Sequence, residues 1–126
     1  MDDIEAIKQL TARCARASDE GDWETWLECF TADATFRRSN DTRGFSGHEE
    51  LKQLRGRIGV RARHVTSDYE IQVTGDVASQ ICYLMFLDCD NEFRVWMFGT
   101  YHDELRKEHD AWKFSRRFLV VDTPQG

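Results

Sequence analysis

The chain of 126 residues has a formal net charge of −6, 40% hydrophobic residues, 32% charged residues and one proline, which is typical of one compact domain spanning residues 1–126. The acidic balance disfavours nucleic-acid binding, because phosphate contacts need lysine and arginine gathered on one face. No apolar run reaches the roughly 18 residues of a membrane span, and the acidic start MDDIE is unlike a signal peptide, so we expect a cytoplasmic protein without a membrane partner.

Apolar residues recur at three- and four-residue steps near the start of the chain and predict an amphipathic helix over residues 3–19. Its core-facing stripe consists of Ile4, Ile7, Leu10, Cys14 and Ala17. Gly21 can adopt the left-handed conformation that ends a helix, and Asp22 is expected to cap a second helix. The apolar face of that second helix consists of Trp23, Trp26, Leu27 and Phe30.

The stretch SDEGDW, residues 18–23, places carboxylates where the first helix ends. Negative charge at this end opposes the helix dipole. Asp22 is explained as a helix cap, and Glu20 is expected to face water. Asp19 gains neither benefit, so its position requires another partner.

The middle of the chain contains a predicted short strand over residues 34–38, a polar loop with the sequence SNDTRG and a third helix from about Gly47. Ser46 and Glu49 have the spacing of a capping box for that helix. The arginine-rich stretch RGRIGVRAR, residues 55–63, is interpreted as a solvated loop, with an anion-binding patch as the alternative.

From Arg63 onward the hydrophobic pattern changes to the two-residue alternation of strands. Four long strands are predicted over residues 64–73, 77–88, 93–105 and 112–122. Because short turns join them, neighbouring strands should be antiparallel, with the short strand added at an edge. These elements predict an α+β fold in which a cone-shaped, curved antiparallel sheet wraps around the N-terminal helices and encloses a pocket.

Both alternating sets of side chains in these strands are largely apolar, so the sequence leaves open which face of the sheet lines the pocket. The candidate substrate-binding residues are Tyr83, Met85, Trp96 and Phe98. One of the adjacent Arg116 and Arg117, with Arg116 as the candidate, is expected to turn inward as an anchor for a carboxylate or enolate. The alternative is that both arginines are charges at the rim.

Two stretches carry a resemblance to a known superfamily, ARCARASDEGDWETWLECFTADATF at residues 12–36 and GTYHDELRKEHDAWKFSRRFLVVD at residues 99–122. The chain resembles the nuclear transport factor 2-like superfamily, in particular its SnoaL-like and scytalone dehydratase-like branch. The resemblance spans nearly the whole chain and implies a cone-shaped α+β barrel with a hydrophobic pocket. It also implies a homo-oligomer, for which we favour a dimer, with a trimer as the alternative.

The same resemblance gives Asp19 a partner. Scytalone dehydratases pair a histidine at the start of the long second strand with an aspartate before the xxDW turn, and these positions correspond to His64 and Asp19. Two tyrosines of that pattern are replaced here by Ser18 and Arg38. Polarisation of a substrate carbonyl would then fall to Tyr83, to Tyr101 or to a different carbonyl activator.

A histidine beside a carboxylate is suited to general acid–base catalysis. Imidazole titrates near pH 6.5 when unperturbed, so it can take and return a proton at neutral pH. The carboxylate fixes which ring nitrogen carries hydrogen and stabilises the imidazolium. Asp19 and His64 are therefore expected to form a catalytic pair, with a structural ion pair or no contact as the alternatives.

The leading functional hypothesis is a small enzyme without a cofactor or metal that dehydrates, isomerises or cyclises a hydrophobic, carbonyl-bearing small molecule. The cysteines lack a CxxC pair or metal-ligand spacing and are expected to be small buried residues: Cys14, Cys29, Cys82 and Cys89. The alternative is a non-catalytic ligand-binding protein or a scaffold like the small subunits of ring-hydroxylating dioxygenases, which the C-terminal half also resembles.

Overall fold

The computed structural model describes residues 1–54 and 61–122, so most of the arginine-rich stretch lies outside the described residues. The helical elements are α1 (Asp3–Glu20), α2 (Trp23–Glu28), α3 (Gly47–Leu51) and the 3-10 turn η1 (Lys52–Leu54). The strands are β1 (Phe30–Arg38), β2 (Gly44–Ser46), β3 (Ala62–Thr74), β4 (Val77–Asp88), β5 (Arg94–Glu108) and β6 (Ala111–Val121). None of the helices in these residues combines the length and apolarity needed to cross a membrane.

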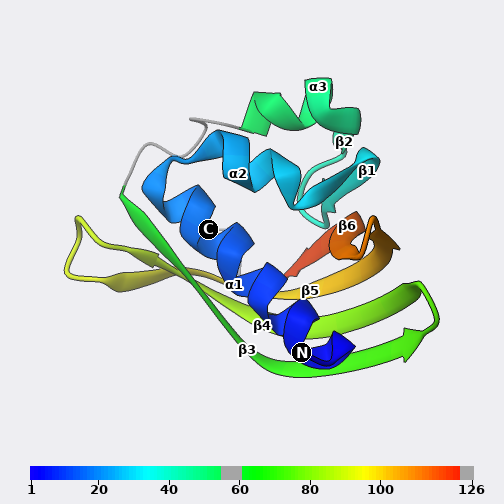
Figure 1. The fold of residues 1–126 in the computed structure, drawn as a ribbon. Helices are drawn as coiled ribbons and strands as arrows, with labels where there is room; N and C mark the ends of the chain where they lie inside the picture. The colour runs from blue at the N-terminus through cyan, green and yellow to red at the C-terminus, as the bar shows by residue number, and fades with distance from the viewer. Residues whose placement is uncertain (55–60, 123–126) are drawn as a thin grey trace.

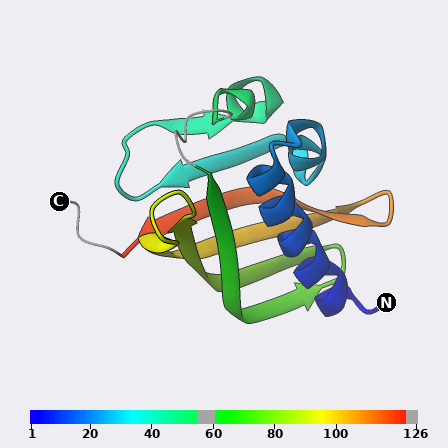
Figure 2. The ribbon, with the colours of Figure 1, turned by 90° about the vertical axis from the view of Figure 1, so that its left-hand side faces the viewer.

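The strands form one sheet with the order β2-β1-β6-β5-β4-β3. Strands β3 to β6 form the predicted antiparallel meander. The sheet curves strongly, and α1 lies across its concave side (Figures 1 and 2). This arrangement confirms the predicted α+β fold, in which a curved sheet wraps around the N-terminal helices.

The first strand differs from the prediction in length and pairing. It begins at Phe30 rather than at Ala34, and it pairs in parallel with β6. The loop predicted after it contains β2, which pairs with β1 through Phe36 and Phe45. A three-residue strand is too short to show an alternating pattern, and a parallel pairing between distant segments leaves no turn signal in the sequence.

The turn between α1 and α2 agrees with the sequence prediction. Gly21 ends α1 with a φ angle of 73°, and the Asp22 carboxylate accepts a hydrogen bond of 3.2 Å from the backbone N–H of Thr25. At α3 the prediction was wrong in detail, because the Glu50 carboxylate, and not that of Glu49, accepts the backbone N–H of Ser46.

The start of α1 is attached to the β5–β6 hairpin through Asp3. The indole N–H of Trp112 and the ammonium group of Lys107 donate to one oxygen of the Asp3 carboxylate, at 3.0 and 3.1 Å. These hydrogen bonds lower the pKa of Asp3. The apolar stripe of α1 packs on the sheet with Ile7, Leu10 and Cys14 buried, whereas Ile4, which was predicted to belong to this stripe, is 47% exposed. The helix is thus held at its N-terminus and along its length, which fixes the position of its C-terminal turn.

Candidate active site

A cavity of about 520 Å³ lies between the first two helices and the concave side of the sheet. A group of aromatic side chains forms part of its wall, including Trp23, Trp26, Phe30, Phe36, Phe86 and Trp96. The remaining wall includes polar and charged side chains, among them His64, Tyr101 and Arg117. A chamber of this size and lining suits a small hydrophobic molecule that carries a few polar groups.

Asp19 and His64 meet at the edge of this cavity. Asp19 belongs to the last turn of α1, and His64 is near the start of β3. An oxygen of the Asp19 carboxylate lies 2.6 Å from Nδ1 of His64, and the two carboxylate oxygens accept the backbone N–H of His64 at 3.1 and 3.2 Å. The side chains of His64 and Asp19 are 14% and 12% exposed. Asp19 therefore fixes the end of α1 to β3, which accounts for a carboxylate at the unfavourable end of the helix dipole.

The contact determines the protonation pattern of the imidazole. An ionised carboxylate can only accept hydrogen bonds, so Nδ1 of His64 carries the hydrogen and Nε2 is the basic nitrogen of the neutral ring. The ring also packs edge-on against Phe86, with 4.7 Å between the ring centroids and 82° between the planes. The carboxylate and this ring contact hold the imidazole in one orientation at the cavity wall, as a general base requires.

Trp96 lies in the cavity wall because of an irregularity in β5. Phe86 pairs with Met97 and Leu87 pairs with Val95, so Trp96 is an extra residue in its strand. Such a β-bulge changes the face to which the side chain points. The ring of Trp96 accordingly packs against the ring of Phe86, with 5.5 Å between the ring centroids.

The expected placement in the cavity was wrong for Tyr83, Met85 and Phe98, none of which lines it. Tyr83 is 55% exposed and Phe98 is 47% exposed; Trp96 is also 48% exposed, but part of its surface belongs to the cavity wall. The buried positions of β4 are the even-numbered ones, including Cys82 and Leu84, so Tyr83 and Met85 point to the convex face.

The inward-facing arginine is Arg117, and the expectation for Arg116 was wrong. The side chain of Arg116 is 52% exposed and lies 3.9 Å from the Glu104 carboxylate. Arg117 lines the cavity and is 4% exposed. Successive residues of a strand point to opposite faces, so only one of the two could enter the cavity.

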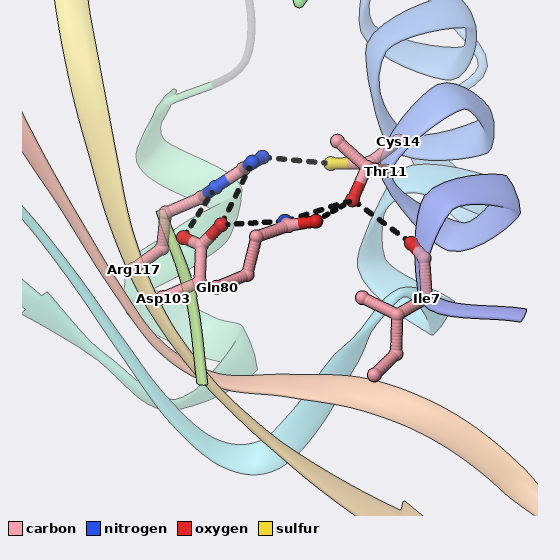
Figure 3. A network of polar contacts seen from close by, with 6 residues as sticks. All are labelled: Ile7, Thr11, Cys14, Gln80, Asp103 and Arg117. Carbon is pink, nitrogen blue, oxygen red and sulfur yellow. Dashed lines mark hydrogen bonds and ion pairs between the residues drawn. The ribbon is translucent and has the colours of Figure 1, made fainter. Parts of the chain in front are cut away.

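Arg117 belongs to a buried polar network that crosses the sheet and reaches α1 (Figure 3). Its Nε and Nη2 donate to the two oxygens of the Asp103 carboxylate at 2.9 and 3.3 Å, and Nη1 lies 3.6 Å from the Cys14 sulfur. The Gln80 amide donates to Asp103 and to the Thr11 hydroxyl, both at 3.0 Å. The network links three strands to the first helix, and its members Thr11, Cys14 and Arg117 belong to the cavity wall.

Burial raises the pKa of the Asp103 carboxyl, although the neighbouring Arg117 and Gln80 act to lower it. The guanidinium stays charged at all ordinary pH values, and its forked contact needs acceptor oxygens, so the two residues form an ion pair at neutral pH. Sequence reasoning missed Asp103 and Gln80. Their signal is a polar residue at an inward position of a strand, which becomes visible only once the inward face is known.

All four cysteines are free and buried, as the sequence predicted. Burial raises the pKa of Cys82 to about 12, so its thiol stays protonated and weakly nucleophilic at neutral pH. Within residues 1–54 and 61–122, no cluster of three or more His, Cys, Asp or Glu side chains is arranged to hold a metal ion.

Comparison with known proteins places the fold in a family context. The family model described as SnoaL-like domain matches residues 1–118. A structure of Rv3472, a protein of unknown function from Mycobacterium tuberculosis, is 30% identical with a TM-score of 0.88, over 96% of this chain and 72% of that chain. A search of curated proteins finds no match.

Two structures from Novosphingobium aromaticivorans share the fold at lower identity. One is a nuclear transport factor 2-like protein with a cystatin-like fold, 20% identical with a TM-score of 0.87, over 98% of this chain and 84% of that chain. The other is a proposed scytalone dehydratase, 21% identical with a TM-score of 0.82, over 95% of this chain and 84% of that chain.

Proposed function

We propose that this chain, which belongs to the SnoaL-like domain family of the nuclear transport factor 2-like fold, is an enzyme that performs general acid–base chemistry on a hydrophobic, carbonyl-bearing small molecule. The observation that carries the proposal is the Asp19–His64 pair at the wall of an aromatic cavity. The likeness to a proposed scytalone dehydratase agrees with it at the level of the fold.

The reaction begins with transfer of a proton from the carbon next to the carbonyl group to Nε2 of His64. Asp19 stabilises the imidazolium that forms, because its carboxylate lies 2.6 Å from Nδ1. The proton then returns to a leaving hydroxyl group, which departs as water, or to another carbon of the molecule. These two outcomes are a dehydration and an isomerisation. In a cyclisation, the enolate carbon attacks a second carbonyl of the same molecule, and the alkoxide that forms takes the proton from His64. Each of them uses only protein side chains.

The aromatic wall is expected to supply most of the binding energy, and Trp96 offers the clearest test of it. Replacing Trp96 with Ala should weaken binding of aromatic ketones about tenfold or more, because a large stacking surface is lost. A thermal-shift screen followed by calorimetry measures this effect, since a ligand that binds only the native state raises its stability. Phe93→Ala is the matched control, because Phe93 is 59% exposed and is absent from the cavity wall. Equal losses in the two variants would contradict binding in this cavity.

We also propose that the protein forms a homodimer through the convex face of the sheet. Val65 pairs with Met85, and Met85 pairs with Phe98, so an apolar row crosses three strands on this face. Val65 is 41% exposed and Phe98 is 47% exposed. Size-exclusion chromatography should give a dimer for the wild type and a monomer for Phe98→Glu, because the new charge would be buried at the interface. A monomeric wild type would refute the proposed dimer. A trimeric wild type would refute it as well, because three subunits are related by a threefold axis and not by a twofold axis.

We propose the cytoplasm as the place of action, where the four buried thiols would stay reduced. A non-catalytic ligand-binding protein or oxygenase subunit would share the cavity but would gain nothing from a basic Nε2 held at its wall. The proton-transfer experiment in the Discussion separates these functions from the enzyme.

A further inference from the structure

Tyr101 is a buried tyrosine whose hydroxyl group lacks a partner in the described part of the chain. The residue is 5% exposed and lines the cavity. By contrast, the hydroxyl of Tyr69 lies 2.6 Å from the Thr66 hydroxyl, and Tyr83 is exposed on the convex face. Among the described residues, this hydroxyl is not one of the fully enclosed side-chain atoms that lack a hydrogen bond, so it is accessible from the cavity. A polar group of a bound molecule would complete the hydrogen bonding of Tyr101.

Arg117 fixes the Tyr101 ring and strengthens it as a donor. The central carbon of the guanidinium lies 3.5 Å from the ring centroid, which is a close cation–π contact. The bonds to Asp103 and Cys14 hold the guanidinium in this place. A positive charge over the ring draws electron density from the phenol oxygen, which makes the O–H group a stronger hydrogen-bond donor.

The phenol also keeps its proton. Burial raises the pKa of Tyr101 above its ordinary value, against the lowering effect of Arg117. A neutral phenol at pH 7 can donate its hydrogen to an acceptor oxygen. Tyr101 therefore suits a ketone, enolate or phenolate oxygen better than a cationic group.

Tyr101 and His64 occupy different parts of the cavity wall. His64 pairs with Phe86 on β4, whereas Tyr101 pairs with Cys82 on the same strand. The separation between Phe86 and Cys82 corresponds to roughly 13 Å along the strand. A molecule that reaches both residues would therefore carry a second oxygen for Tyr101, away from the carbonyl group whose neighbouring carbon reacts at His64.

We propose that Tyr101 forms an oxygen-binding subsite of the cavity, in which its hydroxyl donates a hydrogen bond to a ketone or phenol oxygen of the bound molecule other than the carbonyl oxygen next to the carbon that reacts at His64. Arg117 acts on this subsite as a positioning residue through the Tyr101 ring. That the molecule bound in this subsite is a substrate rests on the proposed function. Binding of its oxygen by Tyr101 does not require His64.

The test compares two probes that differ by one oxygen, 2-naphthol and naphthalene, in protein-observed NMR titrations. The wild type should bind 2-naphthol about tenfold or more tightly than naphthalene, and Tyr101→Phe should lose this preference. Tyr83→Phe is the matched control and should keep it. Because the Tyr101 hydroxyl has no partner among the described residues, Tyr101→Phe is expected to fold with undiminished thermal stability.

The same titrations with His64→Gln separate the subsite from the proposed reaction. The preference for 2-naphthol should persist in this variant, so a failure of the proton-transfer hypothesis would leave it intact. Retention of the preference in Tyr101→Phe would overturn the assignment. Equal affinity for the two probes in the wild type, or binding of neither, would overturn it as well.

Discussion

Replacing Arg117 with Met is expected to lower the free energy of unfolding by about 3–5 kcal/mol, because it leaves the Asp103 carboxylate buried without its cation. Both side chains are almost fully enclosed, at 5% and 0% exposure. Urea denaturation followed by tryptophan fluorescence measures the change. The double variant Arg117→Met with Asp103→Leu should recover most of the loss, since neither charge then remains in the core.

Arg116→Met is the matched control for this experiment. Arg116 is the preceding residue of the same strand, but its ion pair with Glu104 is exposed and 3.9 Å long. Its replacement should change the free energy of unfolding by no more than about 0.5 kcal/mol. Similar losses for Arg116→Met and Arg117→Met would contradict the view that the buried network joins the sheet to α1.

Replacing His64 with Gln is expected to lower the rate of proton transfer on a bound ketone by about 10²–10⁴-fold, the range typical of a general base. Asp19→Asn should also cause a large loss, because an amide neither stabilises the imidazolium nor enforces hydrogen on Nδ1. Exchange of the α-hydrogens for deuterium in D2O, followed by NMR, measures the proton transfer directly. This exchange measurement can be used whether the later product is a dehydrated, isomerised or cyclised molecule.

His102→Gln is the control for this series, because His102 is exposed on the outside of the sheet. This variant should exchange the α-hydrogens of the ketone for deuterium at the wild-type rate. Circular dichroism checks that His64→Gln and Asp19→Asn keep their fold. Loss of activity in His102→Gln as well would point to a general effect of removing histidine and not to the Asp19 pair.

The first helix and the turn that leads into the second were predictable because their signals are local. The apolar stripe of α1, the glycine that ends it and the Asp22 cap are each determined by residues a few positions apart. The meander was predictable for the same reason, since two-residue alternation and short turns specify antiparallel neighbours. The parallel contact between β1 and β6 joins segments about 80 residues apart and has no such signal.

The contact between Asp19 and His64 was predictable from two signals that agreed. The position of Asp19 at the end of a helix has no local benefit, and the resemblance to scytalone dehydratases supplied His64 as its partner. The structure brings the two side chains within 2.6 Å. Their catalytic role stays a proposal.

The rest of the cavity wall depends on the phase of each strand, which the sequence could not determine. Both faces of β4 and β5 are rich in apolar residues, and the extra residue at Trp96 turns that side chain inward while Phe98 points outward. The choice of Arg117 over Arg116 follows from the phase of β6 in the same way. Once the inward face is known, Tyr101 and Asp103 can be identified from the alternation of β5.

The most direct test of the central claim is the rate of α-hydrogen exchange for a cyclic aromatic ketone, such as 1-tetralone, with wild-type protein and with folded His64→Gln. We expect the wild type to accelerate exchange far above the rate in buffer and His64→Gln to lose about 10²-fold or more of that acceleration. Equal acceleration by the two proteins, or none by the wild type with any ketone shown to bind in the cavity, would contradict an enzyme built on the Asp19–His64 pair.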